Sequence, residues 1–408
     1  MRKAPERNRG TPWEVLAVAG RLGITSFGGP IAHLGYFHEE YVVRRKWLDE
    51  RSYADLVALC QMIPGPASSQ LGIAIGMERA GFWGGVASWI GFTLPSAIAL
   101  TCFALLVHGS GLGSAGWLHG LLVVAVAVVA QALWSMSRAL TPDAPRRTIA
   151  FAAAMASVLL PSSLTQISLI AAGAIVGSLF LKPDGAEDAP GTGTRPGSTG
   201  RVAAIACLSL FALLLIGLPV LRAAVGSQWI ALVDSFYRSG SLVFGGGHVV
   251  LPLLQREVVP TGWISNDAFL AGYGAAQAVP GPLFAFAAYL GAVMGPAPNG
   301  ALGAAVALAA IYLPSFLLVI GLLPFWKALR RRSVVRSALS GVNSSVVGIL
   351  LAALYTPVWT SAMARPADFA IGLAAFLLLA VWKVRPWIVV VAGAAAGEAL
   401  GLALGLRG

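Results

Sequence analysis

Two arginines stand in positions where a charged side chain is costly. Arg21 and Arg238 each lie six residues before a Phe-Gly-Gly sequence, inside otherwise weakly polar stretches. A guanidinium group donates two parallel hydrogen bonds to an oxyanion, and a charge among apolar residues by default marks a ligand path or an ion partner. We predict that both arginines bind a tetrahedral anion. The alternatives are an arginine that extends to a polar surface and a pairing of Arg238 with Asp234, one helical turn away.

The tripeptide Pro-Gly-Pro occurs twice inside apolar sequence, at Pro64–Pro66 and Pro280–Pro282. Proline removes a backbone donor and pushes the preceding residue out of the helical region, so each tripeptide should break a helix. The half-helix after a break presents N–H groups and the positive end of its dipole, which favours an anion. A purely structural kink is the alternative. The residues predicted to contact the anion are Arg21, Arg238, Gly28, Gly29, Pro64, Gly65, Pro66, Ser68, Ser69, Gln70, Gly245, Gly246, Gln277, Pro280, Gly281 and Pro282.

The two breaks differ in chemistry, and few residues nearby can titrate. Polar side chains follow the first break, whereas Leu283, Phe284 and Phe286 follow the second. The candidates for proton coupling are Asp55, Glu40, Glu257 and His248. A solvated helix face is the alternative for the two glutamates. The sequence contains no phosphate-binding loop, H-E-x-x-H or G-x-S-x-G motif, and its three cysteines are isolated, so we expect no metal, no cofactor and no enzyme.

The elements that position these residues follow from composition. Of 408 residues, 57% are hydrophobic and only 11% are charged, whereas a soluble domain carries about 25% charged residues. The chain is therefore predicted to be an all-α polytopic membrane protein. The net charge of +11 lies in short basic clusters between apolar segments, which is typical of cytoplasmic loops rather than of nucleic-acid binding.

About thirteen apolar segments are predicted to cross the membrane, since a bilayer core takes about 20 helical residues. A polar, Pro- and Gly-rich stretch, Lys182–Gly200, is predicted to be a flexible linker. The segments are Thr11–Gly28, Ser52–Met77, Gly81–Val107, Gly116–Met136, Thr148–Leu160, Leu164–Leu181, Val202–Leu221, Gln228–Phe244, Asp267–Met294, Gly300–Trp326, Val334–Tyr355, Asp368–Trp382 and Trp387–Leu406.

The chain also repeats itself at an offset of about 217 residues. We infer an internal duplication, with a first repeat at 1–181, a linker and one connecting helix at 182–226, and a second repeat at 227–408. The matched landmarks are Arg21 with Arg238, Phe27-Gly28-Gly29 with Phe244-Gly245-Gly246, Glu40 with Glu257, Trp47 with Trp263, the two Pro-Gly-Pro sequences, and Leu94-Pro95-Ser96 with Leu313-Pro314-Ser315.

The basic loops predict that the two repeats have opposite orientations. Arg79 precedes the third segment of the first repeat, whereas the equivalent helix of the second repeat ends in a basic cluster that starts at Lys327. An inverted repeat with a cytoplasmic N-terminus and a periplasmic C-terminus follows, with a substrate site near the membrane midplane. Arg44-Arg45-Lys46 fits this topology only if the chain before it is re-entrant; otherwise the charge rule fails there.

The chain resembles the long-chain form of the chromate ion transporter family. The resemblance rests on Thr25–Pro30, Arg44–Leu48 and Leu59–Pro66 in the first half, and on Phe244–Gly247 and Gln277–Pro282 in the second. It implies a protein of the bacterial inner membrane that exports chromate, driven by the proton-motive force, and confers chromate resistance. It also implies that sulfate competes with chromate or is transported by some members.

Three alternatives to chromate export stay open at this point. The first is an uptake carrier or exchanger for sulfate or another oxyanion on the same scaffold, and the second is a chromate-reducing membrane enzyme. The third is a membrane scaffold that transports nothing. The expected partners are chromate, sulfate as a competitor, and the lipid bilayer, without nucleic acid. The oligomeric state stays open, with a homodimer among the candidates.

Overall fold

The computed structural model describes residues 10–27, 29–109, 116–181, 198–244, 249–326 and 332–403. Every regular element within these ranges is helical, as expected for backbone that must satisfy its own hydrogen bonds in lipid. The predicted all-helical class is therefore confirmed for the described residues. Most of the predicted linker, residues 182–197, lies outside them.

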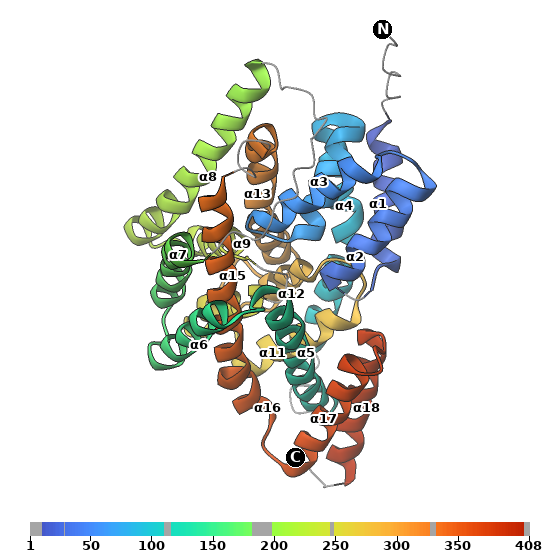
Figure 1. The fold of residues 1–408 in the computed structure, drawn as a ribbon. Helices are drawn as coiled ribbons and strands as arrows, with labels where there is room; N and C mark the ends of the chain where they lie inside the picture. The colour runs from blue at the N-terminus through green and yellow to red at the C-terminus, as the bar shows by residue number, and fades with distance from the viewer. Residues whose placement is uncertain are drawn as a thin grey trace.

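The first half of the chain begins with short helices and ends with a longer helix and a hairpin (Figure 1). Its elements are α1 (Pro12–Thr25), α2 (Gly29–Phe37), the π-helical turn η1 (His38–Arg44), α3 (Glu50–Met62), α4 (Ala67–Gly109), α5 (Gly116–Leu140), α6 (Ala144–Leu159) and α7 (Ser163–Phe180).

One helix, α8 (Ser198–Val225), connects the two halves. The elements of the second half are α9 (Gln228–Ser241), α10 (Val250–Val258), α11 (Asn266–Ala278), η4 (Leu283–Ala285), α12 (Phe286–Val293), α13 (Gly300–Leu322), η5 (Leu323–Phe325), α15 (Ser333–Ala353), η6 (Leu354–Trp359), α16 (Thr360–Ala362), α17 (Pro366–Ala380) and α18 (Pro386–Ala403).

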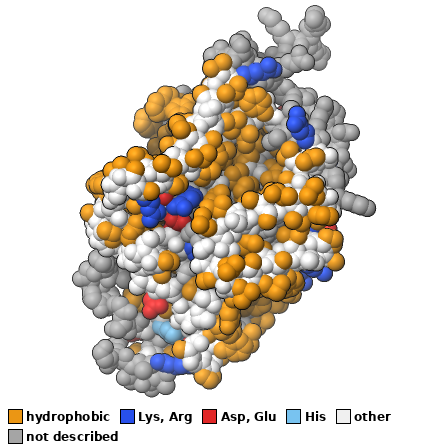
Figure 2. Space-filling model, turned by 90° about the vertical axis from the view of Figure 1, so that its left-hand side faces the viewer, with side chains coloured by type: hydrophobic (Ala, Val, Ile, Leu, Met, Phe, Trp, Pro, Cys, Tyr) orange, Lys and Arg blue, Asp and Glu red, His pale blue; other side chains and the backbone are white. Residues whose placement is uncertain are grey.

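Apolar side chains are prominent on the surface of the molecule. Figure 2 shows one face that is largely hydrophobic, with few charged side chains. Within the described residues, five helical stretches are long and apolar enough to cross a membrane, and four further apolar helices are shorter. The connecting helix α8 is the least buried of the five. The structure is therefore that of a polytopic membrane protein.

The first Pro-Gly-Pro breaks its helix, as predicted. Helix α3 ends at Met62, and Ile63 and Gly65 leave the helical region before α4 begins at Ala67. Helix α4 is itself bent at Ala80 and Gly81, whose backbone is non-helical. A Cβ built on Gly76 would lie 2.4 Å from the carbonyl oxygen of Gly84, so the two arms of α4 pack back to back as a hairpin.

Two of the predicted spans, Ser52–Met77 and Asp267–Met294, are consequently not single crossings. In the first half the guanidinium of Arg79, after the break, lies 5.1 Å from the ring of Trp47, which precedes α3. In the second half the N–H of Gly295 donates to the carbonyl oxygen of Trp263 at 3.0 Å. Each pair of short helices therefore returns to the end from which it started. Hydropathy missed this because two half-helices together have the apolar length of one span.

The bundle has two ends, which we name after Arg79 and Asp368. At the Arg79 end, Arg79 pairs with Glu14 at 3.2 Å and stacks on Trp47, so α1 and α3 both start there. At the Asp368 end lie the starts of α5 and α17, with α16, α17 and α18 at the bottom of Figure 1. Arg44-Arg45-Lys46 directly precedes Trp47 at the Arg79 end. The chain between α1 and α3 therefore returns to the end at which α1 begins.

The last hairpin of each half packs on the long helix of the other half. Helices α6 and α7 pack on α15, and α17 and α18 pack on α5. Small residues spaced by four line both interfaces, which lets the backbones approach closely. The closest residues are Gly173 and Gly177 with Ser337 and Gly341, and Gly116 and Gly120 with Gly393 and Gly397. This exchange binds the two halves into one body.

Candidate functional site

The two Pro-Gly-Pro breaks cross the two Phe-Gly-Gly segments reciprocally. The N–H of Gly65 donates to the carbonyl oxygen of Val243 at 2.7 Å, and the N–H of Gly281 donates to that of Ser26 at 2.9 Å. Ser26 and Val243 are matched in the repeat, and each stands directly before its Phe-Gly-Gly. Each half therefore supplies the break that satisfies the other half's unwound backbone.

Glycine is required at the centre of each break by both conformation and space. Gly65 and Gly281 have φ of +126° and +95°, which residues with a Cβ rarely adopt. A Cβ on Gly281 would lie 3.0 Å from Ser96 Oγ, and one on Gly65 would lie 3.1 Å from Ser315 Oγ. Ser96 and Ser315 end the two matched Leu-Pro-Ser sequences. Each break is therefore packed against a serine of the opposite half.

Polar side chains gather around the first break. His33 Nδ1 lies 3.3 Å from Ser68 Oγ, and Ser69 Oγ lies 3.4 Å from the hydroxyl of Tyr312 in the other half. The amide nitrogen of Gln70 donates to the carbonyl oxygen of Pro64 at 2.6 Å, which stabilises the break itself. The three polar residues predicted from the sequence to follow the break are all buried there.

Many polar atoms around the crossing are buried without a hydrogen-bond partner among the described residues. Such atoms are rare in folded proteins, and a group of them points to water or a ligand in contact with them. They come from both halves and from the elements on either side of the breaks. The atoms are Ser26 Oγ, His33 Nε2, Gln70 Oε1, Thr93 Oγ1, Gln277 Nε2 and Ser315 Oγ.

A small cavity of about 50 Å³ lies beside the second break. Gly29 reaches it from the first half, and Gln277 and Gly281 from the second. Gln131 of α5 adds a second amide, while the remaining lining is apolar. The predicted residues Gly29, Gln277 and Gly281 thus share one cavity, and Gln131 is an addition that the sequence did not indicate.

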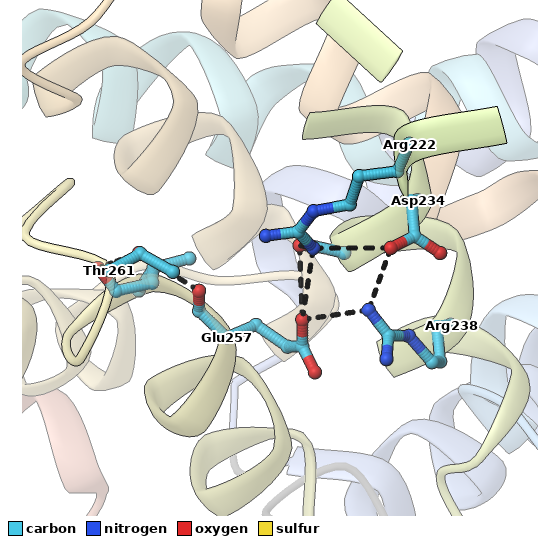
Figure 3. Close-up of polar contacts among 7 residues, drawn as sticks. Arg222, Asp234, Arg238, Glu257 and Thr261 are labelled. Carbon is cyan, nitrogen blue, oxygen red and sulfur yellow. Dashed lines mark hydrogen bonds and ion pairs between the residues drawn. The ribbon is translucent and has the colours of Figure 1, made fainter. Parts of the chain in front are cut away.

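Arg238 is part of a network of four charged residues (Figure 3). Its Nη2 lies 2.7 Å from Asp234 and 3.0 Å from Glu257. Arg222 of α8 lies 3.2 Å from Asp234 and 3.8 Å from Glu257. Ser235 donates to Glu257 at 3.0 Å and accepts from Arg222 at 3.1 Å. Both carboxylates are almost fully buried, so the network balances two buried negative charges with two positive ones.

Arg21 occupies a different environment from its repeat partner. Arg21 is exposed on α1, and the acidic residue whose pKa it influences is Glu40. Glu40 is 5% exposed and forms ion pairs with Arg44 and Arg45 at 2.7 and 2.8 Å. Burial would raise the pKa of Glu40, but the hydrogen bond from Arg45 and the charges of Arg44, Arg45 and Arg21 together lower it. Glu40 is therefore ionised at neutral pH.

Arg21 and Arg238 lie in different surroundings, and their role in anion binding stays a prediction. Within the described residues, no hydrogen bond or ion pair joins Arg21 to Arg238 or either of them to a Pro-Gly-Pro break. Arg238 satisfies the alternative reading, a pairing with Asp234, because α9 places the two side chains one turn apart on the same face. The crossing of the breaks is instead lined by backbone, amide and hydroxyl groups.

The remaining predicted residues are distributed as follows. Asp55 is half-buried on α3, with its own polar contacts, and Glu257 belongs to the charged network. Pro64, Pro66, Pro280 and Pro282 form the two breaks. Gly28, Gly245, Gly246 and His248 lie outside the described residues. Tyr312, Thr93 and the two Leu-Pro-Ser serines were not predicted as site residues, although the repeated Leu-Pro-Ser sequence was a visible signal for Ser96 and Ser315.

Apolar spans combined with broken helices that meet at a buried polar centre define a polytopic membrane transporter. Residues 13–178 and 230–398 each match the model of the chromate transporter family. The chain belongs to this family, which consists of transporters and not of enzymes.

Full-length relatives agree with this assignment. The chain is 27% identical to a probable chromate transport protein of Synechococcus elongatus over 92% of both chains. It is 26% identical to a chromate transport protein of Pseudomonas aeruginosa, over 91% of this chain and 88% of the relative. A chromate transport protein of Cupriavidus metallidurans is 25% identical over 92% of this chain and 89% of the relative. No solved structure matches the chain.

Proposed function

We propose that this protein exports chromate across the bacterial inner membrane, driven by the proton-motive force, and thereby confers chromate resistance. The substrate comes from the family and from the names of full-length relatives. Direction and driving force are our inference from the asymmetry of the site and from the resemblance to exporters. Chromate is a tetrahedral dianion, and the proposed site must therefore supply several hydrogen-bond donors.

The anion is proposed to bind at the crossing of the two breaks. The observation that carries this proposal is the group of unpartnered buried polar atoms around the two breaks, of which Gln277 Nε2 belongs to a residue that also lines the cavity. Amide and hydroxyl groups donate to an oxyanion without burying a countercharge. The start of α4 after Pro66 adds N–H groups and the positive end of a helix dipole. Arg21 and Arg238 are proposed to act outside this centre.

The two halves, 1–181 and 227–408, are proposed to be inverted repeats joined by 182–226. Their reciprocal hydrogen bonds at Gly65 and Gly281 support a two-fold relation between them. Arg44, Arg45, Lys46 and Arg79 share one end of the bundle, which the positive-inside rule assigns to the cytoplasm. The N-terminus would then be cytoplasmic and the C-terminus periplasmic. Movement of one half against the other would expose the crossing alternately to each side.

A sulfate or general oxyanion carrier that works as an uptake system or exchanger is the second candidate. The same donors accept any tetrahedral dianion, because amides and hydroxyls do not distinguish the central atom. The two candidates differ in direction and in the dependence on protons, and a flux measurement separates them. A homodimer is compatible with either candidate.

The proposed function is tested with radiolabelled chromate and everted membrane vesicles that contain the full chain. We expect accumulation that an uncoupler abolishes and that excess sulfate reduces. Accumulation that ignores the uncoupler and follows a counter-anion gradient would replace export by exchange. Absence of flux in everted vesicles together with uptake by right-side-out vesicles would reverse the direction.

A variant in the same assay locates the site. Gln277→Leu removes a buried amide nitrogen that has no partner in the described part of the chain, and it should weaken chromate binding about tenfold, which corresponds to roughly 1.4 kcal/mol. Gln228→Leu is the matched control, because its amide nitrogen is also buried without a partner among the described residues but lies outside the cavity. Equal KM values for both variants and the wild type would remove Gln277 from the site.

A further inference from the structure

A buried carboxylate and a histidine join the two halves at the Asp368 end. Asp368 is 0% exposed, and its Oδ1 lies 2.8 Å from Nε2 of His119. Its Oδ2 accepts the backbone N–H groups of Ala364 and Arg365 at 3.2 and 2.9 Å. The His119 side chain is 32% exposed, so the pair is reached from the surface of the molecule through the imidazole. Every oxygen of this carboxylate therefore has a donor, and one of those donors is the imidazole of the other half.

The pair lies in only one of two equivalent interfaces. His119 belongs to α5 of the first half and Asp368 to α17 of the second. In the other interface between the halves, the helix α15 of the second half packs on α6 of the first half in the same way. There Asp143, at the start of α6, caps its own helix and pairs with Arg146 at 2.6 Å, within one segment. Asp368 thus pairs across the two halves, whereas Asp143 pairs within its own helix.

The same two helices form a wall of the cavity. Val128 and Gln131 of α5 line it, and so does Leu379 of α17. Gln131 follows His119 by twelve residues, or about 18 Å along the helix. Leu379 follows Asp368 by eleven residues, or about 17 Å. Because both helices are continuous between these points, a change in their contact at the pair reaches the cavity wall.

Other ionisable groups lie on elements that pack against α5 and beside the start of α17. Glu398 of α18 accepts the backbone N–H of Trp117 at 3.0 Å, two residues before His119. Arg365 flanks α17 and is exposed, Asp267 at the start of α11 is exposed, and Tyr355 of η6 is exposed. Within the described part of the chain, no lysine or arginine forms an ion pair with Asp368. His119 is therefore the group that can compensate the buried carboxylate.

We propose that His119 and Asp368 form the proton-binding site that couples proton entry to anion transport. The proposal rests on the proposed function, proton-driven export. A proton bound from the Asp368 end gives an imidazolium paired with the buried carboxylate and holds α5 against α17. Its release leaves a buried carboxylate facing a neutral ring and loosens that contact. The protonated and deprotonated states of the pair thus favour different arrangements of the cavity wall. One proton is taken up and one is released in each transport cycle.

Two assays on the full-length protein in proteoliposomes test this site. The first measures chromate flux driven by an imposed pH gradient, and the second measures chromate counterflow at equal pH, which needs no net proton movement. Asp368→Asn keeps an oxygen acceptor for the two N–H groups but cannot carry the charge. We expect the driven flux to fall about tenfold, which lies within the usual range of coupling, while counterflow stays within about twofold of the wild type.

His119→Gln is the second variant, because glutamine can still donate to Asp368 without titrating. We expect it to flatten the pH profile of the driven flux and to leave counterflow intact. Asp143→Asn is the control, since it changes the capping aspartate at the start of the equivalent helix α6. Its driven flux should match the wild type.

The outcomes separate this proposal from the one on which it rests. Wild-type protein without pH-driven flux would overturn proton-driven export and the role of the pair with it. If the wild type shows pH-driven flux and both Asp368→Asn and His119→Gln retain it with an unchanged pH profile, the proposed role of the pair is wrong while proton-driven export stands. Loss of counterflow in Asp368→Asn together with an unchanged profile in His119→Gln would show that Asp368 only caps α17.

Discussion

Arg21 and Arg238 occupy the same position in two copies of one sequence and have different surroundings. Arg238 pairs with Asp234 and Glu257, both buried, whereas Arg21 is exposed. The residue that matches Asp234 is Ala17, and Glu40, which matches Glu257, pairs instead with Arg44 and Arg45. Repeat alignment could therefore have indicated which arginine has an ion partner. The contribution of Arg222 could not be predicted, since it comes from α8, outside both repeats.

The residue scale gives a prediction about stability. Arg238→Gln leaves Asp234 and Glu257 with Arg222 alone, and an uncompensated buried carboxylate costs about 3 kcal/mol. Arg21→Gln removes an exposed charge and should change stability by less than about 0.5 kcal/mol. Thermal unfolding of the two purified variants in detergent measures the difference. Equal unfolding midpoints would contradict a structural role of the network.

At the scale of elements, the breaks were predictable and the path of the chain around them was not. Pro-Gly-Pro ended both helices where the sequence indicated, because proline and its preceding residue leave the helical region by local sterics alone. Whether the chain then continues or turns back depends on contacts such as Arg79 with Trp47 and Gly295 with Trp263. These contacts join residues far apart in sequence, and hydropathy carries no information about them.

The break of the second half gives a prediction about single glycines. Gly281→Ala combines a positive φ with a Cβ that would lie within 3.3 Å of Ser96 Oγ and of two backbone carbonyl oxygens, Phe92 and Gly23. Gly262→Ala is the control, since Gly262 has φ of +74° but no atom within 4 Å of the added Cβ. The control should lose about 1 kcal/mol of stability and keep its flux. Gly281→Ala should lose transport, and wild-type flux in this variant would show that the crossing tolerates displacement.

At the scale of the whole molecule, the exchange of hairpins explains why neither half is a separate body. The long helix of each half packs on the hairpin of the other through Gly or Ser residues four apart. The spacing was present in the sequence at Gly116 and Gly120, Gly173 and Gly177, and Gly393 and Gly397. A pattern of this kind marks a packing face but does not identify its partner. The pairing between halves therefore emerged only from the structure.

The two ends of the bundle lead to a prediction about orientation. Lys46 is exposed at the Arg79 end, and Arg365 is exposed at the Asp368 end. In a background with Cys60, Cys102 and Cys207 replaced by alanine, we expect Lys46→Cys to react with a membrane-impermeant maleimide only from the cytoplasm. Arg365→Cys should react only from outside. The reason is that α1 and the segment after it fold back, which keeps Arg44, Arg45 and Lys46 with the other basic residues of that end.

The comparison of intact cells with everted vesicles distinguishes this topology from the alternative in which Thr11–Gly28 crosses fully. A full crossing of Thr11–Gly28 would place Lys46 outside the cell. Arg79 would then also lie outside, because it stacks on Trp47, which is adjacent to Lys46. Labelling of Lys46→Cys in intact cells would therefore displace the entire Arg79 end to the periplasm. It would also reverse the side from which His119 and Asp368 receive protons, so the orientation of the bundle determines the direction of the proposed coupling.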